Sequence, residues 1–408
     1  MSNQLQSSPP PPAPLFILRG HSSQIHALTF LRQNSRLLTA DSDGYVILWN
    51  IPTRRPVAAW KAHESAVLEV AVWGDNKIIT HGRDNKLLVW KLGPEEEAGM
   101  DTITPADAQL GLGRTWRKPW LLNSLEVNAL NFCGFAASPS TSGHAALTTS
   151  SIFVVFPSNM DSESVDIWKL PEQQRVYAGI KARDIQTGMA MSLRLFWLDE
   201  KSLALAAGYE SGHVCLYVRD TSQEVAEWKM WFARKEHSQP VLSIALSPDH
   251  RYVLSSSADA NIVKHSIPTD ASDDSRMKIM DTKHSGQQSI RIRDDGKLFA
   301  TGGWDKMVRV YSMKTMKELA VLKWHREGVY AVGFGTTKSP GQNAQSVYSQ
   351  QTSTASDTVA MPELVQTLST ASTSGYLTLE QRRDERETCR HWIAAGAKDG
   401  KVSLWEIY

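Results

Sequence analysis

Histidine, a hydroxyl residue and aspartate recur together along this chain, and these are the side chains of a hydrolytic triad. The first group is His21, Thr39 and Asp43, with Trp49 six residues beyond the aspartate. In a hydrolase the histidine would take the hydroxyl proton as the oxygen attacks a carbonyl, while the carboxylate orients the imidazole. An active site needs such a set only once, so the number of copies decides between catalysis and structure.

The same set returns at nearly fixed offsets. Histidine precedes aspartate by 21 or 22 residues, the hydroxyl stands four before the aspartate, and a ring-bearing residue follows six after it. The further sets are His63, Thr80, Asp84 and Trp90; His237, Ser255, Asp259 and His265; His284, Thr301, Asp305 and Tyr311; and His325, Asp399 and Trp405, the last with a longer first interval. Repetition of this kind indicates that each set of side chains is hydrogen-bonded within its own repeat and stabilises it, which we call bracing. We therefore predict no enzyme and no catalytic residue.

Two further units are degraded, which brings the number of repeats to seven. The aspartate and tryptophan positions hold Ser162 and Trp168 in one unit and Ser211 and Tyr217 in the other. The hydroxyl position holds Ala207 in the fourth unit and Ala395 in the seventh. A buried histidine or aspartate is costly unless each donor and acceptor is matched, so we expect incomplete bracing in these two units.

The elements that must position these side chains are short strands. Each unit carries β-branched or aromatic segments separated by Gly, Asp, Asn and Ser turns, and helical periodicity is nearly absent. Four short strands in about 40–50 residues are typical of a propeller blade. We therefore predict an all-β, seven-bladed β-propeller over residues 15–408. The final unit ends at its third strand, so an N-terminal strand, Leu15–Leu18, is expected to close the last blade.

Three segments fall outside the repeat. Residues 1–14 read as a disordered proline-rich tail. An acidic and glycine-containing insertion over 93–114 is expected between blades two and three, so that Trp116 and Trp120 would open blade three. A Ser/Thr/Gln-rich insertion over 335–388 is expected to be a disordered loop in blade seven, with the charge run Arg382–Glu387 as its solvated stem. This loop is either a tolerated surface insertion or a modified, partner-binding segment.

Composition excludes several classes of function. The 408 residues carry a formal charge of +1, which predicts neither direct nucleic-acid binding nor an anionic membrane surface. The three cysteines have no metal-ligand spacing, and no loop has the context of a nucleotide-binding motif. We therefore expect no cofactor, no metal, no small-molecule substrate and no membrane association. Protein recognition is what remains.

The residue before each turn aspartate should project toward one face of the ring, near its channel. These positions hold Arg83, Glu210, Trp304 and Lys398, together with Ser42, Asp161 and Ala258. Arginine and tryptophan are frequent interface anchors, so we interpret the first four as a candidate protein-binding face. The alternative is that Trp304 merely covers the mouth of the ring.

The chain resembles the WD-repeat family, through Gly20-His21, Ala62-His63 and the tryptophans that follow each turn aspartate. A closer resemblance rests on the proline-rich start leading into LFILRGH, the segment WLLNSLEVNALNFCGF, the stretch ending at Pro171 and the long loop before the final blade. These features are similar to the fungal ASTRA-associated WD-repeat proteins, a family related to guanine-nucleotide-binding-protein beta-subunit-like proteins. The similarity spans essentially the whole chain.

That resemblance implies a nuclear, non-catalytic subunit of the ASTRA complex, with the cytoplasm as a second location. It implies links to chromatin remodelling and to maturation of phosphatidylinositol-kinase-related kinases, with co-chaperone, RuvB-like ATPase and kinase-related scaffold partners. Two alternatives stay open. A G-protein beta-like signalling adaptor would carry an N-terminal helix, where this chain has a short proline-rich stretch. A substrate receptor of a ubiquitin ligase would bring an additional domain outside the ring.

Overall fold

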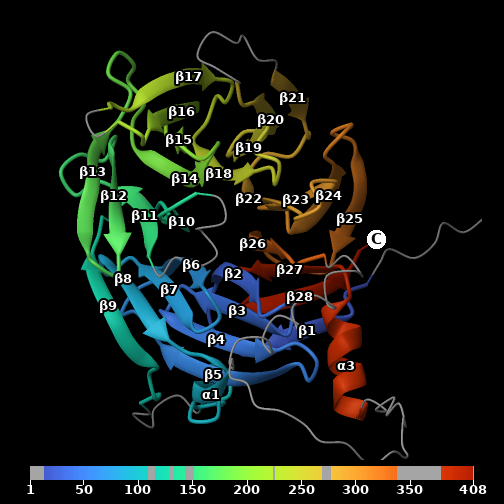
Figure 1. Cartoon of the computed structure of the whole chain (residues 1–408). Helices are drawn as coiled ribbons and strands as arrows, with labels where there is room; N and C mark the ends of the chain where they lie inside the picture. Colours follow the sequence, from blue (N-terminus) through green and yellow to red (C-terminus); the bar gives the residue numbers. More distant parts are fainter. Residues whose placement is uncertain are drawn as a thin grey trace, which may run out of the picture.

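Short β-branched and aromatic segments alternate with turns along nearly the whole chain, and the structure is built of strands accordingly. The computed structural model describes residues 13–108, 115–128, 132–142, 151–223, 226–268, 277–337 and 378–407. Within these ranges, 28 strands form seven four-stranded antiparallel sheets, arranged as blades around a central axis (Figure 1). The all-β, seven-bladed β-propeller predicted from the sequence is confirmed.

The first four blades each use four consecutive strands, counted from the channel outward. Blade one contains β2 (Ile25–Leu31), β3 (Arg36–Asp41), β4 (Tyr45–Asn50) and β5 (Arg55–Lys61). Blade two contains β6 (Val67–Trp73), β7 (Lys77–Gly82), β8 (Lys86–Lys91) and β9 (Trp120–Glu126). Blade three contains β10 (Ala136–Pro139), β11 (Ile152–Pro157), β12 (Val165–Leu170) and β13 (Gln174–Ile180). Blade four contains β14 (Ala190–Trp197), β15 (Ser202–Tyr209), β16 (His213–Asp220) and β17 (Lys229–Lys235).

The last three blades complete the ring. Blade five contains β18 (Val241–Leu246), β19 (Tyr252–Ser257), β20 (Asn261–Ser266) and β21 (Met277–Asp281). Blade six contains β22 (Gln287–Ile292), β23 (Leu298–Gly303), β24 (Met307–Ser312) and β25 (Glu318–Lys323). Blade seven contains β26 (Val329–Phe334), β27 (Trp392–Ala397), β28 (Lys401–Glu406) and, from the other end of the chain, β1 (Phe16–Arg19).

The two ends of the chain meet in blade seven. Strand β1 pairs antiparallel with β28, with Phe16 opposite Leu404 and Arg19 opposite Lys401. Figure 1 shows this blue strand beside the red strands of the last blade. The strand predicted over Leu15–Leu18 is confirmed, shifted by one residue. It covers what would otherwise be an exposed sheet edge.

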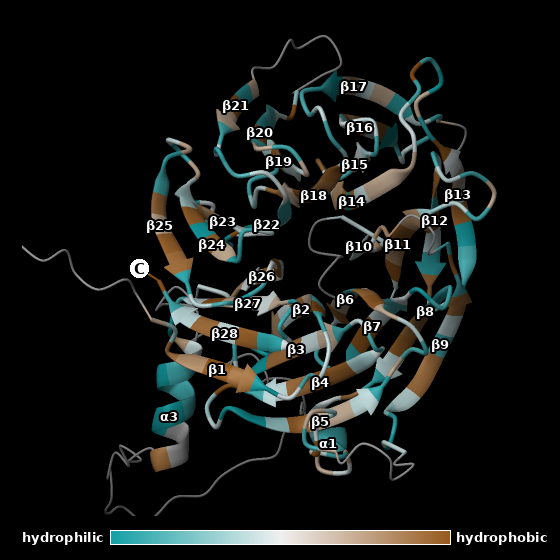
Figure 2. Ribbon diagram, turned by 180° about the vertical axis from the view of Figure 1, so that it is seen from behind, coloured by the Kyte–Doolittle hydropathy of each residue, from teal (hydrophilic) through white to brown (hydrophobic). Residues whose placement is uncertain are grey.

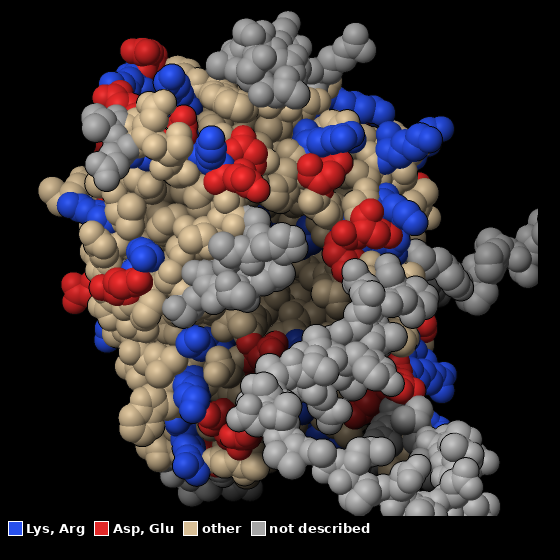
Figure 3. Space-filling view, in the orientation of Figure 1, with Lys and Arg blue, Asp and Glu red and all other residues tan. Residues whose placement is uncertain are grey.

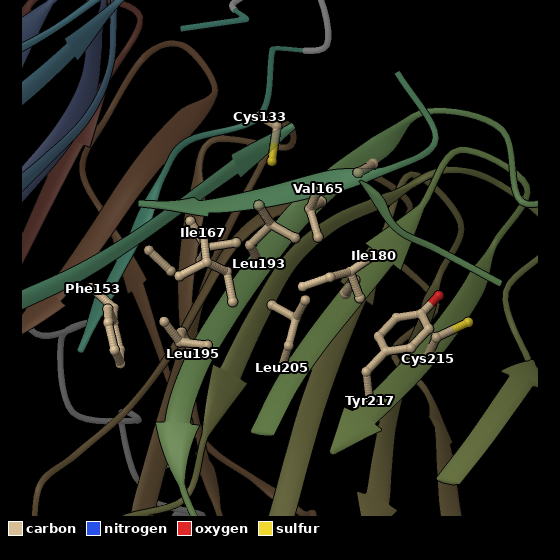
Figure 4. Packing of buried hydrophobic residues seen from close by; sticks show 14 of the residues in the cluster. Cys133, Phe153, Val165, Ile167, Ile180, Leu193, Leu195, Leu205, Cys215 and Tyr217 are labelled. Carbon is tan, nitrogen blue, oxygen red and sulfur yellow. The ribbon is translucent and has the colours of Figure 1, made fainter. Parts of the chain in front are cut away.

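Hydrophobic clusters lie between the blades. Each of the seven clusters of buried residues combines side chains from two neighbouring sheets. Figure 4 shows the cluster between blades three and four, where Val165 and Ile167 of β12 face Leu193, Leu195 and Leu205. Because every junction is apolar, each blade buries its faces only when both neighbours are present.

The acidic insertion lies inside blade two, which corrects the sequence-based placement. Residues 93–114 separate β8 from β9, and they include the short helix α1 (Pro94–Glu97); 109–114 lie outside the described residues. Trp120 therefore belongs to blade two, at the start of its outer strand, and Trp116 packs edge-on against Tyr45 of blade one. The sequence-based prediction was wrong because it took the outer strand of blade two to follow β8 directly, without an insertion between them.

The end of the second insertion is helical, not disordered as expected. Residues 338–377 lie outside the described residues, but α3 (Leu379–Thr388) is an α-helix that immediately precedes β27. It stands against the rim of the ring, beside β1 and β28 (Figures 1 and 2). The backbone carbonyl of Glu387 accepts from Trp392 Nε1 at 2.8 Å, and Asn34 Nδ2 donates to the Thr388 carbonyl at 3.1 Å. These two contacts fix the helix to blades seven and one.

Candidate protein-binding site

Blade two shows the recurring polar set in full. Trp90 Nε1 donates to Thr80 Oγ1 at 3.0 Å, Thr80 Oγ1 lies 2.7 Å from His63 Nε2, and His63 Nδ1 lies 2.8 Å from Asp84 Oδ1. Because a carboxylate can only accept, the Nδ1–H of His63 donates to Asp84; in this tautomer Nε2 accepts from the Thr80 hydroxyl, which in turn accepts from the indole N–H. Every link in this buried chain is therefore matched. We call such a chain of hydrogen bonds a brace.

Blade one corrects one predicted residue. His21 Nε2 and Trp49 Nε1 meet Thr39 Oγ1 at 2.7 and 2.9 Å, but His21 Nδ1 bonds to Asp41 Oδ2 at 2.7 Å, not to Asp43. Asp43 is exposed. Asp41 follows Thr39 by two residues on β3, so both side chains lie on one face of the strand. Its second oxygen also accepts the backbone N–H groups of the turn that follows.

Blade five uses a second histidine in place of tryptophan. His237 Nε2 lies 2.8 Å from Ser255 Oγ, and its Nδ1 lies 3.2 Å from both oxygens of Asp259. His265 Nε2 lies 2.9 Å from the same Ser255 Oγ. Burial lowers the pKa of His265 to about 3, so the ring is neutral and its Nε2–H supplies the donor that an indole supplies elsewhere.

In blade six the predicted histidine does not join a brace. The His284 side chain is 43% exposed, and its Nδ1 is 3.6 Å from Asp305 Oδ2. Instead, Arg309 Nη2 donates to Asp305 Oδ2 at 2.6 Å. Arg309 stands opposite Thr301 in the pairing of β23 with β24, and its buried side chain takes the place of a histidine as the partner of Asp305. The assignment of His284 as a bracing residue is wrong.

In blade seven the expected gap is filled from the next strand. Ala395 has no hydroxyl, but Ser403 lies opposite it on β28. His325 Nε2 lies 2.8 Å from Ser403 Oγ, and Trp405 Nε1 donates to the same oxygen at 2.8 Å. His325 Nδ1 lies 3.3 Å from Asp399 Oδ2. The brace of blade seven is therefore complete, contrary to the prediction.

Blades three and four have other polar contacts at these positions. In blade four the Tyr209 and Tyr217 hydroxyls lie 2.9 Å apart, and Ser211 Oγ contacts His213 Nδ1 at 2.7 Å. Ala207 pairs with Cys215, which supplies no hydroxyl. In blade three, Ser158 Oγ donates to Asp166 Oδ2 at 3.1 Å.

The geometry of the braces does not suit catalysis. The hydroxyl residues Thr39, Thr80, Ser255 and Ser403 are all fully buried, so none of these oxygens can reach a substrate. Among the residues that the structure describes, no group of three or more His, Cys, Asp or Glu side chains could hold a metal ion. Nor is any described helix long and apolar enough to cross a membrane.

The four face residues are all exposed, and three of them contact residues that line the central channel. Arg83 lies over the ring of Phe132, with 4.0 Å between its Cζ and the ring centroid. Trp304 Nε1 donates to Gln288 Oε1 at 2.8 Å, and Lys398 Nζ lies 5.8 Å from the ring centroid of Tyr330. The lining partners are Phe132, Gln288 and Tyr330. We call the exposed surface around these contacts the channel-side face.

Glu210 and Trp304 are positioned by the backbone of neighbouring turns. Glu210 Oε2 accepts from Met189 N at 3.3 Å. Gly286 has a φ of +76°, and a Cβ there would lie 2.2 Å from the Trp304 ring. Only glycine therefore allows the indole to lie flat on this turn. The Trp304 residue remains 46% exposed.

Phe132 belongs to this face but was not among the predicted residues. It is 59% exposed, and its φ of 55° is unusual for a bulky side chain. Backbone conformations of this kind concentrate at functional positions. The sequence offered no signal for it, because Phe132 precedes β10 and lies outside the repeating motif.

The channel itself holds three charged side chains from three first strands. Glu69 of β6 lies 3.5 Å from Arg291 Nη2 of β22, and Arg194 of β14 lines the same cavity of about 90 Å³. Burial and, to a lesser extent, the nearby Arg291 lower the pKa of Arg194 to about 10, while Glu69 opposes both effects. Figure 3 shows the hollow at the centre of the ring, with acidic and basic side chains mixed around it.

A second exposed apolar area lies on the rim. Trp120 is 75% exposed, and Leu121 and Leu122 follow it on β9, the outer strand of blade two. Figure 2 shows the mixture of hydrophobic and hydrophilic residues along this strand. Trp120 provides a useful contrast to Trp304, because both indoles are exposed but they occupy different surfaces.

Comparison with known proteins identifies the family. A family model described as ASTRA-associated protein 1 matches residues 14–405. The chain is 43% identical over its whole length to ASTRA-associated protein 1 of Penicillium rubens, covering 99% of that protein. It is 42% identical to the Verticillium alfalfae protein of this name, over 100% of this chain and 96% of that protein. The chain belongs to the ASTRA-associated protein 1 family.

Membership of the ASTRA-associated protein 1 family confirms the resemblance drawn from the sequence. The Schizosaccharomyces pombe member is 33% identical over 84% of this chain and 97% of its own length. The match to the family model runs from the residues just before β1 to Trp405 in β28. It therefore covers both strands that close the ring.

Proposed function

We propose that this chain is a non-catalytic scaffold subunit of the ASTRA complex, and that it binds partner proteins through the channel-side face. The observation that carries the proposal is the full-length similarity to ASTRA-associated protein 1. The fold supports it, because the recurring polar sets serve as braces with buried hydroxyls. A closed ring also presents a rigid surface, so binding orders few additional residues.

The proposal extends to the biological setting that the family implies. Under this proposal the chain acts in the nucleus, with the cytoplasm as a second location. It contributes to chromatin remodelling and to maturation of phosphatidylinositol-kinase-related kinases. Its partners are then co-chaperone, RuvB-like ATPase and kinase-related scaffold components. The chain supplies contacts to these proteins and no chemistry.

The composition of the channel-side face supports a protein partner. Trp304 and Phe132 expose aromatic surface at the mouth of a polar channel, and Arg83 stacks on Phe132. Aromatic and arginine side chains dominate the energetics of protein interfaces. Both aromatics are held by neighbouring groups, so little side-chain entropy is lost on binding.

Affinity purification followed by mass spectrometry tests this function. The tagged wild-type chain should recover ASTRA subunits from its native cells, and Trp304→Ala should reduce that recovery at least tenfold. Trp120→Ala removes an even more exposed indole from the rim and serves as the matched control. Recovery of no ASTRA subunit by the wild type would contradict the complex assignment. Full recovery by Trp304→Ala would contradict the assignment of the channel-side face.

A further inference from the structure

A basic pocket lies on the rim of the ring, where α3 packs against blades seven and one. Its volume is about 450 Å³. The lining residues are Leu15, Phe16, Arg54, Arg382, Arg383, Arg386, Glu387 and Arg390. We call it the arginine pocket. It shares no residue with the channel-side face, so a ligand of this pocket is independent of any partner bound at that face.

The helix gathers charges that alternate in the sequence. From Arg382 to Glu387 the sequence mixes arginines with aspartate and glutamates. This pattern predicted a solvated loop stem. With 3.6 residues per turn, Arg382 and Arg386 lie one above the other, with Arg383 beside them. Asp384 and Glu385 do not line the pocket. The fold therefore presents a basic face that the linear pattern hides.

One buried carboxylate organises the floor of the pocket. Glu387 is 4% exposed, and its two oxygens lie 3.3 Å from Arg54 Nη2 and 3.3 Å from Arg390 Nη1. The Arg54 guanidinium also stacks on the Phe16 ring, 3.3 Å from its centroid. Burial lowers the pKa of Arg54; Glu387 opposes this, and Arg390 and Arg383 lower it further. The guanidinium groups of Arg54, Arg383 and Arg390 therefore lie close enough to repel one another.

The positive charge exceeds the negative charge that the described residues supply. Glu387 is shared by two arginines, and Arg390 also lies 3.6 Å from Glu406. Arg382, Arg383 and Arg386 are exposed and form no ion pair with a described residue. Three guanidinium groups thus face solvent beside a pre-positioned pair, and this concentration of positive charge attracts an anion.

We propose that the arginine pocket binds a phosphorylated segment of a partner protein. A phosphate monoester carries up to two negative charges and three acceptor oxygens, which matches several planar guanidinium forks better than a single carboxylate does. Leu15 and Phe16 provide an apolar wall for the flanking peptide. The site is one compact pocket and not an extended basic stripe, and the chain as a whole carries only +1. Both features favour a phosphopeptide over nucleic acid.

Fluorescence anisotropy with the full-length protein tests this proposal. The probes are a short fluorescein-labelled peptide with two phosphoserines flanked by glutamates, its unphosphorylated twin, and a labelled single-stranded DNA dodecamer. The phosphopeptide should bind at least tenfold more tightly than either other probe. The double variant Arg382→Ala/Arg386→Ala should weaken its binding at least tenfold, because two charge-assisted contacts are removed.

The matched control is Arg251→Ala, which removes an arginine with a 78% exposed side chain far from the pocket in sequence and in blade. It should bind the phosphopeptide like the wild type. All variants should show wild-type thermal unfolding, since the changed side chains are on the surface. Equal affinity for both peptides, tighter binding of the DNA, or full binding by the double variant would each overturn the proposal.

Discussion

At the scale of single residues, one hydroxyl oxygen links two buried nitrogen atoms in each brace. In blade seven this oxygen is Ser403 Oγ, which meets His325 Nε2 and Trp405 Nε1, both at 2.8 Å. Removing it leaves a buried acceptor and a buried donor without a partner, and removal of one such hydroxyl costs about 1–3 kcal/mol. The braces are thus a source of stability that can be tested residue by residue.

The first prediction concerns Ser403→Ala. Its free energy of unfolding should fall by roughly 2 kcal/mol, measured by urea denaturation. Ser285→Ala, at an exposed position, is the control and should change nothing. Adding Ala395→Ser to Ser403→Ala returns a hydroxyl to the position that Thr80 occupies in blade two, and most of the loss should be recovered. No loss in the single variant would show that the oxygen is not essential to the brace.

The second prediction concerns pH and His81. Its ring is fully buried, and burial lowers its pKa to about 3, with a smaller contribution from His63. The unfolded chain takes up this proton near pH 6.5, and the folded chain does not until about pH 3. Stability is therefore fully present above pH 6.5 and is lost as the pH falls, by about 1.4 kcal/mol per unit.

His81→Phe removes this titration and keeps the edge-to-face contact with Phe135. Between pH 6.5 and pH 5 the variant should lose about 2 kcal/mol less stability than the wild type, measured by urea unfolding at each pH. His284→Gln, at a half-exposed ring, is the control and should follow the wild-type curve. Parallel curves for His81→Phe and the wild type would refute the prediction.

Sequence spacing predicted the brace of blade two completely, since each partner stands at a fixed distance along the chain. It could not find Ser403, because that residue reaches the site through cross-strand pairing with Ala395. It also misplaced the carboxylate of blade one. In blade two the residue two before Asp84 is Gly82, where any side chain would collide with His63, so the carboxylate must come from Asp84. In blade one the equivalent of Gly82 is Asp41, and this residue supplies the carboxylate.

At the scale of elements, β1 is a four-residue strand that joins the two ends of the chain in blade seven. Leu18 is 2% exposed, and it packs in the cluster between blades seven and one. Without β1, strand β28 would present an unpaired edge. The sequence predicted this strand because the last unit was one strand short. It did not predict α3, because charge alternation over a few residues does not distinguish a helix from a loop.

The third prediction is that deleting Leu15–Leu18 lowers the midpoint of thermal unfolding by about 5 °C or more. The deletion removes the backbone bonds to β28 and the buried Leu18, which together contribute several kcal/mol, and 1 kcal/mol corresponds to about 1 °C in a chain of 408 residues. Deleting residues 1–12 is the control, because it leaves β1 and its pairing unchanged. An unchanged midpoint without Leu15–Leu18 would mean that β1 does not close the ring.

At the scale of the whole molecule, stability is a sum of local braces and of junctions between neighbouring blades. Each brace joins side chains of one sheet, whereas each hydrophobic cluster joins two sheets. A closed ring has no terminal blade, so every sheet has two neighbours. Loss of one brace therefore weakens a blade, while the ring still unfolds as one unit.

The fourth prediction follows from that separation and concerns two braces in blades that do not touch. Thr80→Val in blade two and Ser255→Ala in blade five each remove a central hydroxyl, so each should cost about 1–3 kcal/mol. The two sites share no partner, so their costs in the double variant should add within about 0.5 kcal/mol. Urea unfolding should remain a single transition by fluorescence and by circular dichroism. A combined cost well above the sum would mean that strain passes around the ring from blade to blade, and the braces would then have to be understood as one network.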